Sequence, residues 1–428
     1  MAVDSANHLL IVGAGAAGLM AGRTLARAGR QVTIIEARER LGGRILTLPT
    51  EEFGFPAEGG AEFVHGEATE TRAIVKDAGL ALAPLEGRAW SARRGRLTAD
   101  RPSFDHGDEL HEALAALTAD QPIADFLAAH FAAHEYEAMR RSITRMVEGY
   151  DAADPARAST FALRDEWMGE GIDEQHRIAD GYGAMIDYLA GDARRHGATI
   201  RLGASVTAID AADAGVRARI DGGETIAADG AILTVPLPLL AGIALPAAVR
   251  ARATRAIAGI GFGNVVKLVL GFGSVWWARQ GGMDLANLSF LFSEAKVPTW
   301  WTQFPQPYPV LVGWYAGPKA DRVRDLSEAA LIEMGIDSLA DSFALPADTL
   351  RGQLVAARAI NWGNDPLARG AYSYATPDTR RIQRELAEPD GSKIYFSGEA
   401  FYPGPDMGTV EAALAAGAAT ARRLIASD

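Results

Sequence analysis

The sequence predicts an α/β protein built around a parallel sheet, and three neighbouring segments support this prediction. Residues 8–12 (HLLIV) form a short apolar run that is typical of a buried strand. A helical pattern of apolar residues follows over 15–28, and Gly29 ends it. Residues 32–35 (VTII) then indicate a second buried strand. Strand, helix and strand make a βαβ unit, the repeating element of parallel sheets.

The rest of the chain predicts further elements in a fixed order. Residues 104–150 are rich in Ala, Leu and Glu at helical spacing, which indicates a helical insertion. Short strands with a turn at 221–223 follow residue 197, and 261–315 is aromatic and β-rich. An alanine-rich helix closes the chain over 408–426. We expect two interleaved domains, each built from separated pieces of the chain.

Composition narrows the class of protein. A chain of 428 residues exceeds one ordinary core, so we expect two or three domain-sized units. The net charge of −12 disfavours nucleic acid as a partner. The absence of cysteine excludes disulfides, thiolate metal sites, a catalytic thiol and a thioether-linked cofactor, and we predict no metal site. No apolar run reaches the ~18 residues of a membrane span, and no basic residue precedes the first apolar run, so we expect a soluble cytoplasmic protein.

Three glycines mark the turn between the first strand and its helix. Gly13, Gly15 and Gly18 form G-x-G-x-x-G, in which the first permits a tight turn and the second lets the backbone approach a pyrophosphate. The third allows close packing of helix and strand, and the helix N-terminus offers amides to phosphate. Glu36 follows 18 residues beyond Gly18, where a carboxylate can bind ribose hydroxyls. The alternative is a glycine turn with a surface glutamate, but the combination predicts a dinucleotide site.

The next segment specifies the dinucleotide. Residues 36–44 (EARERLGGR) place two glycines beside arginines that can pair with pyrophosphate oxygens, although a basic surface turn would have the same composition. This segment resembles the E-A-x-x-R-x-G-G-R signature of the flavin-containing amine oxidase superfamily, which includes monoamine oxidases, polyamine oxidases and lysine-specific demethylases. The resemblance implies FAD rather than NAD, in a soluble bacterial-type member.

The resemblance continues along the chain. It covers 58–66, which looks like a strand beside the flavin, and then 205–209, 233–237, 263–270, 362–373 and 397–413. It implies a Rossmann-like, glutathione-reductase-like FAD-binding domain interleaved with a substrate domain of mixed β-sheet flanked by helices. The expected boundaries are 1–84, 182–258 and 366–428 for the FAD domain, and 85–181 and 259–365 for the substrate domain.

The resemblance also implies which residues contact FAD. Ala371 stands where monoamine oxidases carry the cysteine that bonds to the flavin, so FAD is expected to be held non-covalently. The expected contacts are Gly13, Gly15, Ala17, Gly18, Glu36, Ala37, Arg38, Gly42, Gly43, Arg44, Gly60, Ala61, Glu62, Val206, Trp362, Gly398, Glu399, Gly408, Thr409 and Val410.

Four residues are candidates for catalysis. Lys267 lies in an apolar strand, where a lysine needs a partner; the resemblance implies that it holds a water at flavin N5, and the alternative is an ion-paired or snorkelling side chain. Tyr372 resembles the aromatic wall of amine oxidases, and Thr409 takes the place of a second tyrosine in monoamine oxidases, so the aromatic cage is incomplete. Thr409 is also expected in the first turn of the last helix, whose positive end stabilises reduced flavin. His65 is expected to orient the substrate amine, unless it is a hydrogen-bonded surface group.

The resemblance implies oxidation of a small-molecule amine. Hydride transfer to flavin N5 would give an imine that hydrolyses, and O₂ would reoxidise the flavin and give H₂O₂. L-amino-acid oxidases are an alternative, but they usually carry an arginine near the place of Phe63. Protoporphyrinogen oxidases, desaturases and a flavin-binding protein without turnover are further alternatives. The sequence leaves the oligomeric state open between monomer and homodimer.

Overall fold

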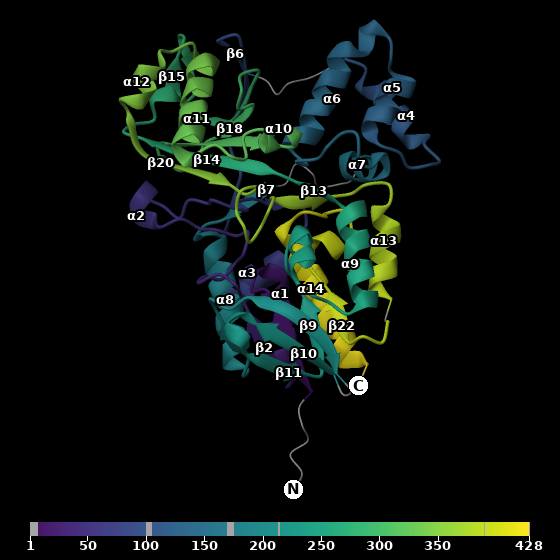
Figure 1. Ribbon diagram of the computed structural model, residues 1–428. Coiled ribbons are helices and arrows are strands. Elements are labelled where there is room, and N and C mark those ends of the chain that lie inside the picture. Colours follow the sequence, from purple (N-terminus) through teal and green to yellow (C-terminus); the bar gives the residue numbers. More distant parts are fainter. Residues whose placement is uncertain (1–6, 100–104, 169–174, 213–214, 389, 428) are drawn as a thin grey trace.

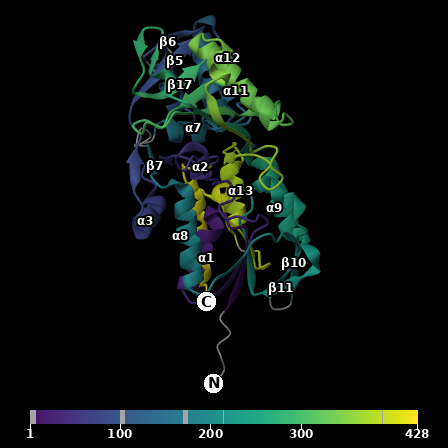
Figure 2. The same ribbon diagram turned by 90° about the vertical axis from the view of Figure 1, so that its left-hand side faces the viewer.

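The computed structural model describes residues 7–99, 105–168, 175–212, 215–388 and 390–427. Figures 1 and 2 show two bodies, one above the other, and the chain crosses between them several times. The last helix of the chain packs in the lower body, close to the first helix (Figure 1). Segments from both ends of the sequence therefore build the lower body together.

The lower body contains a five-stranded sheet in which every neighbouring pair is parallel. Because successive residues of a strand point to opposite faces, Leu9 and Ile11 join one hydrophobic core, whereas Leu10 and Val12 join another. The predicted βαβ unit is confirmed. The strand order is β22 (Ile394–Phe396), β12 (Gly230–Leu233), β1 (His8–Val12), β2 (Gln31–Ile35) and β8 (Thr199–Arg201).

Different elements cover the two faces of this sheet. On one face, α1 (Ala16–Arg27) packs against α14 (Val410–Ala426) and α8 (Gly181–Arg195), with α3 (Thr69–Ala78) beside them. The other face carries the predicted short strands and two helices: β9 (Val206–Ala212), β10 (Gly215–Ile220), β11 (Thr225–Ala228), α9 (Ala247–Gly259) and α13 (Thr379–Ala387).

The upper body contains a seven-stranded mixed sheet. Every residue of β14 (Val265–Phe272) is buried, because α11 (Glu328–Phe343) covers one face and the apolar cluster around Phe53 covers the other. All strand pairs are antiparallel except that of β17 with β5. The strand order is β20 (Leu354–Asn361), β14, β19 (Val310–Ala316), β18 (Thr299–Trp301), β17 (Leu288–Ser293), β5 (Arg88–Arg93) and β6 (Arg96–Thr98).

The predicted helical insertion is confirmed and stands beside the mixed sheet (Figure 1). It consists of α4 (Gly107–Ala115), α5 (Ile123–His130), α6 (Glu137–Gly149) and α7 (Thr160–Trp167), around fully buried residues such as Phe126 and Ile143. Smaller pieces join the two bodies: β13 (Gly261–Gly263) pairs with β21 (Tyr372–Tyr374), and β7 (Gln175–Ile178) pairs with β3 (Val64–His65) and β4 (Leu82–Pro84).

The fold class is therefore confirmed, while one element differs from its prediction. Segment 58–66 was expected as a strand, but only Val64–His65 forms one. The start of this segment packs irregularly against the preceding loop: Gly59 N donates a hydrogen bond to Leu46 O at 2.7 Å. A Cβ at Gly60 would lie 2.0 Å from Arg44 O, so only glycine fits there. The domain boundaries stay a prediction. Among the helices of the described residues, none combines the length and the apolar character that crossing a bilayer requires.

Candidate active site

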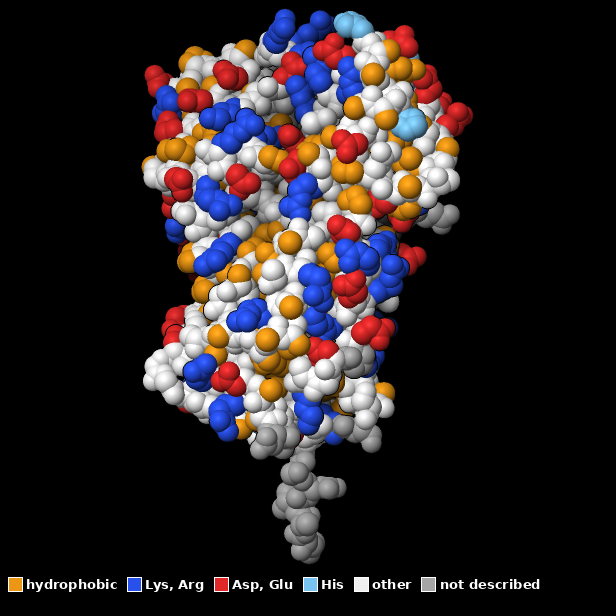
Figure 3. All heavy atoms as spheres, turned by 45° about the vertical axis from the view of Figure 1, so that its right-hand side comes forward, with side chains coloured by type: hydrophobic (Ala, Val, Ile, Leu, Met, Phe, Trp, Pro, Cys, Tyr) orange, Lys and Arg blue, Asp and Glu red, His pale blue; other side chains and the backbone are white. Residues whose placement is uncertain are grey.

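A cavity of about 1640 Å³ is lined by residues of both bodies and of the helical insertion. Pockets for one small ligand measure roughly 300–1000 Å³, so this cavity has room for a large cofactor and a substrate. On the face drawn in Figure 3, basic and acidic side chains are interspersed. The surface charge on that face therefore does not reveal a binding site, and the site is identified from the residues that line the cavity.

The glycine loop borders one end of the cavity. A Cβ built at Gly15 meets only Gly42 O, at 3.8 Å, so the space above this residue is open. A Cβ at Gly18 would lie 2.0 Å from Gly13 O, which explains why helix and strand need glycine there. Glu36 accepts hydrogen bonds from Ala14 N (2.8 Å) and Arg38 N (2.9 Å). These bonds fix a buried carboxylate at the end of β2.

Two helices begin at the cavity. Gly15 precedes α1, provides no side-chain cap, and is followed by no acidic residue in the first turn. The amides of this first turn therefore keep their capacity to bind an anion. Thr409 precedes α14 and is its N-cap, since its hydroxyl oxygen accepts a hydrogen bond from Ala412 N at 3.1 Å. Thr409 was expected inside the first turn, and the structure places it one position earlier.

Glu399 supplies an independent sign of a bound ligand. Its Oε1 accepts hydrogen bonds from Arg44 Nη1 (2.7 Å) and Ser373 Oγ (3.1 Å). Its Oε2 is buried and has no hydrogen-bond partner among the described residues. Burying a carboxylate oxygen without a hydrogen-bond donor costs free energy, so we expect a ligand hydroxyl or an ordered water beside Oε2. A dinucleotide such as the predicted FAD fits these features: the glycine loop, the carboxylates of Glu36 and Glu399, and the amides in the first turn of α1.

Lys267 is the third residue of β14 and is fully buried on the cavity wall. Its Nζ donates hydrogen bonds to Glu62 Oε2 at 2.8 Å and to Gly60 O at 2.9 Å. The ammonium also lies 5.4 Å from the ring centroid of Trp301. The lysine is thus ion-paired, as one alternative proposed, yet it borders the cavity, as the resemblance implied.

Glu62 is the centre of this buried network. Its Oε1 accepts from Arg177 Nε (2.9 Å), Trp301 Nε1 (2.9 Å) and Gln303 Nε2 (3.1 Å). Burial opposes ionisation, but Lys267 and Arg177 outweigh it and lower the pKa of Glu62 to about 2. Two cations therefore surround one carboxylate. Glu62 lines the cavity and its carboxylate contacts Lys267, while its predicted contact with FAD stays a prediction.

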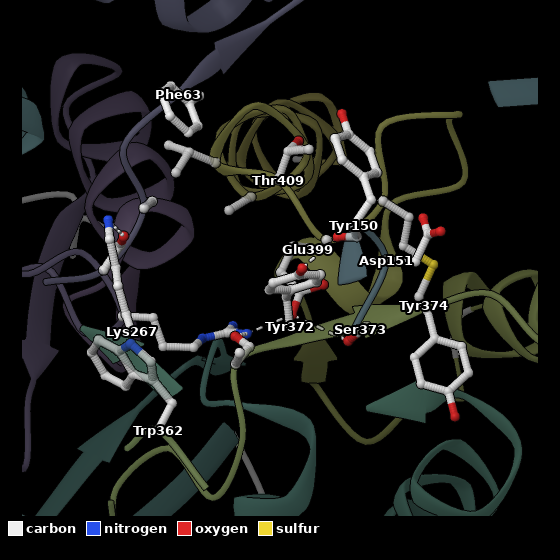
Figure 4. Close-up of a pocket in the computed structure, with 18 of the residues that line it drawn as sticks. Phe63, Tyr150, Asp151, Lys267, Trp362, Tyr372, Ser373, Tyr374, Glu399 and Thr409 are labelled. Atoms are coloured by element: carbon white, nitrogen blue, oxygen red, sulfur yellow. Dashed lines mark hydrogen bonds and ion pairs between the residues drawn. The ribbon is translucent and has the colours of Figure 1, made fainter. Parts of the chain in front are cut away.

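Aromatic side chains form another part of the wall. Tyr372, on β21, stacks on Trp314 of β19, with ring centroids 6.4 Å apart and an interplanar angle of 20°. Its hydroxyl donates to the carbonyl of Tyr150 at 2.6 Å. Figure 4 shows Lys267 and Trp362 on one side of the view and Tyr150 on the other, with Tyr372 between them. The aromatic wall expected at Tyr372 thus has a second ring behind it.

His65 lines the cavity beside Phe63 and Tyr150. Its ring is edge-on to both, with centroids 6.0 and 5.9 Å away. Burial lowers the pKa of His65 to about 4, so the imidazole is neutral at pH 7. A neutral imidazole can accept a hydrogen bond and does not repel an ammonium ion.

The depressed pKa of His65 predicts acid lability. The folded protein binds this proton less readily than the unfolded chain does, so the contribution of His65 to stability is complete above about pH 6.5. It is lost as the pH falls towards 4, by up to about 3 kcal/mol. We expect the melting temperature to fall more steeply between pH 7 and 4.5 in the wild type than in His65→Gln. If the melting temperatures of the wild type and of His65→Gln fell equally over this pH range, the depressed pKa of His65 would be contradicted.

Carboxyl groups line the cavity near Tyr150. Burial, followed by the neighbouring Glu166, raises the pKa of Asp151 well above its usual range. Burial also raises the pKa of Glu166 to about 7, and the nearby Asp406 adds to this rise. At neutral pH the pair of Asp151 and Glu166 therefore retains a proton.

The cavity brings the predicted site residues together with one exception, Gly18, which lies behind the loop. The residues that line it are Gly13, Gly15, Ala17, Glu36, Ala37, Arg38, Gly42, Gly43, Arg44, Gly60, Ala61, Glu62, His65, Val206, Lys267, Trp362, Tyr372, Gly398, Glu399, Gly408, Thr409 and Val410. Sequence reasoning missed Tyr150 and Arg177. Neither carries a local signal: one ends a helix of the insertion, and the other lies in a four-residue strand.

Comparison with known proteins identifies the family. The sequence model of the family described as flavin-containing amine oxidoreductase matches residues 16–425. Polyamine oxidase 4 of Oryza sativa subsp. japonica is 26% identical over 96% of this chain and 87% of its own length. Probable polyamine oxidase 4 of Arabidopsis thaliana is 27% identical over 92% of this chain and 82% of its own length.

Solved structures share the fold. Wild-type putrescine oxidase bound to putrescine aligns with a TM-score of 0.79 and 22% identity, over 98% of this chain and 99% of the other. Cyclohexylamine oxidase from Brevibacterium oxydans IH-35A aligns with a TM-score of 0.80 and 21% identity, over 98% of this chain and 99% of the other. Both bodies of the chain therefore have counterparts in each of these structures.

Proposed function

The chain belongs to the family of flavin-containing amine oxidoreductases, and on that basis we propose that it oxidises a primary or secondary amine at a non-covalently held FAD, with O₂ as acceptor. The observation that carries this proposal is Lys267, a fully buried ammonium group on the wall of a cavity that also fits the cofactor. Replacing both members of a buried ion pair by apolar residues is often neutral or stabilising, so stability alone does not account for Lys267 and Glu62 at this place.

The proposed chemistry divides between cofactor and protein. The glycine loop, Glu36 and Glu399 would hold FAD. Bound there, FAD would supply the redox chemistry, in which a hydride equivalent leaves the carbon next to the amine nitrogen, O₂ gains two electrons and two protons to give H₂O₂, and water hydrolyses the imine product. Lys267 has three N–H donors, of which Gly60 and Glu62 take two. The third remains for a water or a ligand in the cavity. As an ammonium, this side chain donates hydrogen bonds and accepts none.

The walls of the cavity select the charge state of the substrate. An amine arrives mainly as an ammonium ion, which the faces of Tyr372 and Trp314 attract. Oxidation requires the neutral amine, and removal from bulk water favours loss of the proton. Neutral His65 adds no positive charge to this region. The protein thus contributes attraction, desolvation and orientation rather than a nucleophile.

The arrangement around Phe63 bears on the L-amino-acid oxidase alternative. The Arg177 guanidinium lies 4.9 Å from the Phe63 ring centroid, near the place where such oxidases carry an arginine. However, Arg177 Nε donates to Glu62 and its Nη2 donates to Thr302 O at 2.9 Å. These bonds engage Nε and Nη2, and Arg177 is not among the described residues that line the cavity, so this guanidinium is not placed to receive a substrate carboxylate beside Phe63.

A panel of amines tests this proposal directly. We expect peroxide production from mono-, di- or polyamines, and a kcat/KM at least about 100-fold lower for the α-carboxylated analogue of each active amine, because burying an unpaired carboxylate costs several kcal/mol. The measurement is a peroxide-coupled assay with matched pairs of substrates. Equal kcat/KM within a pair would favour an amino-acid oxidase. Absence of peroxide with every amine would favour the remaining alternatives, another class of flavin oxidoreductase or a flavin-binding protein without turnover.

A further inference from the structure

Thr409 provides no second aromatic wall. Its hydroxyl oxygen accepts a hydrogen bond from Ala412 N and donates one to Asp406 O at 2.7 Å, so the side chain is engaged in capping α14. Tyr372 and its stacking partner Trp314 form one aromatic wall. If an amine is to be enclosed by aromatic faces, the other face must come from a different element.

The end of α6 brings such a residue to the cavity. The last carbonyls of a helix have no partner within the helix. Here two cavity-lining aromatic side chains bind them: Trp314 Nε1 donates to Gly149 O at 2.8 Å, and Tyr372 Oη donates to Tyr150 O at 2.6 Å. These bonds fix the backbone of Tyr150 relative to the aromatic wall, although the two lie far apart in sequence.

The ring of Tyr150, unlike its backbone, makes few contacts. The residue lines the cavity and is 48% exposed, which is unusual for a large aromatic side chain in this fold. Its hydroxyl lies 3.5 Å from His65 Nδ1, at the limit of a hydrogen bond. In Figure 4, Tyr150 lies on the side of the view away from Lys267, and Thr409 lies between them at the top. A ring with a fixed backbone and a free face is suited to contact a ligand.

The charges around this ring favour a cation. Although the residue is half exposed, desolvation of the hydroxyl raises the pKa of Tyr150, and the carboxyl groups of Glu166, Asp151 and Asp406 raise it further. The phenol is therefore protonated, and its surroundings carry negative potential. An ammonium ion near the ring gains from both the ring face and these carboxyl groups.

We propose that Tyr150 is the second aromatic wall of the amine site and determines its affinity for the substrate ammonium. The proposal rests on the proposed function, because it assigns the cation at this wall to the amine substrate. It makes the helical insertion part of the substrate site: α6 supplies one wall, and β21 with β19 supplies the other. Affinity for amines is then set by how these elements are held together.

Binding of tert-butylamine to the holoprotein tests this wall without turnover. This amine carries no hydrogen on the carbon next to nitrogen, so it can bind but cannot be oxidised, and changes in flavin absorbance report its Kd. We expect Tyr150→Ala to raise this Kd about 5- to 30-fold, the range between an exposed and a desolvated cation–π contact. Tyr150→Phe retains the ring and should stay within about twofold of the wild type.

Met146→Ala is the matched control, because Met146 is also an exposed, cavity-lining residue of α6 but has no ring. Its Kd should change less than about threefold, and melting temperatures verify that each variant is folded. If Tyr150→Ala does not fold, Tyr150→Leu keeps the bulk and replaces it. A wild-type Kd in the folded ring-less variant would overturn the proposal, and so would an equal loss in Met146→Ala. The amine panel on the wild type remains an independent test of oxidase activity.

Discussion

Gly15→Val is expected to yield a folded protein that is colourless after purification. Gly15 has φ −78° and ψ −176°, a conformation open to any residue, and its Cβ would meet only Gly42 O at 3.8 Å. The valine side chain would therefore extend into the open space where the pyrophosphate is expected. Overfilling such a site costs about 1–3 kcal/mol, which weakens binding by up to about 150-fold before any loss of hydrogen bonds is counted.

Gly18→Ala is the matched control for this prediction. Its Cβ would lie 2.0 Å from Gly13 O, so this variant should lose melting temperature and folded yield. Flavin content by absorbance and secondary structure by circular dichroism separate the two effects. Stoichiometric FAD in a folded Gly15→Val protein would mean that the phosphates bind elsewhere in the cavity.

Lys267→Met is expected to slow one or both halves of the catalytic cycle by about 10- to 1000-fold, or about 1.4–4 kcal/mol of barrier, while FAD remains bound. Methionine preserves the apolar stem but removes the ammonium and its remaining N–H donor. Stopped-flow traces of anaerobic reduction by substrate and of reoxidation by O₂ distinguish the two halves. Wild-type rates in both would remove Lys267 from the reaction and leave it as part of the buried ion network.

The double variant Lys267→Met/Glu62→Gln controls for a charge left without its partner. In the single variant, Glu62 keeps Arg177, Trp301 and Gln303 on Oε1, but its Oε2 loses its only donor from the protein among the described residues. In the double variant, glutamine has no carboxylate oxygen that lacks a donor, and its remaining oxygen can still accept from Arg177. If the lysine itself acts in the reaction, the double variant stays slow; recovery of the rates would attribute the defect to Glu62.

The parts of the fold that were predictable depend on residues close together in the chain. Strand β1, helix α1 and strand β2 follow from local apolar patterns, and the glycine loop between them needs no distant contact. The flavin contacts that the resemblance implies remain a prediction, and each of them rests on a short motif. Segment 58–66 failed as a strand for a non-local reason: Gly60 packs directly against the backbone of Arg44.

The contacts that were missed join distant segments. Glu62 meets Lys267 across 205 positions, and Tyr372 meets the carbonyl of Tyr150 across 222. No periodicity or spacing encodes such a pair, since each partner alone is an ordinary residue of its own element. The sequence could show that a lysine in an apolar strand needs a partner, but the identity of that partner depends on how two bodies pack.

The assembly of the lower body from both ends of the chain has a consequence for biosynthesis. The glycine loop is complete once the first 18 residues have been synthesised, yet Glu399, the cap of α14 and the edge strand β22 come from the last quarter of the chain. Helix α14 also packs on α1, so the first helix lacks its cover until the last one emerges. A nascent chain on the ribosome therefore exposes an apolar surface beside an unfinished nucleotide pocket, and the complete pocket for the cofactor forms only after Glu399 and α14 have been synthesised.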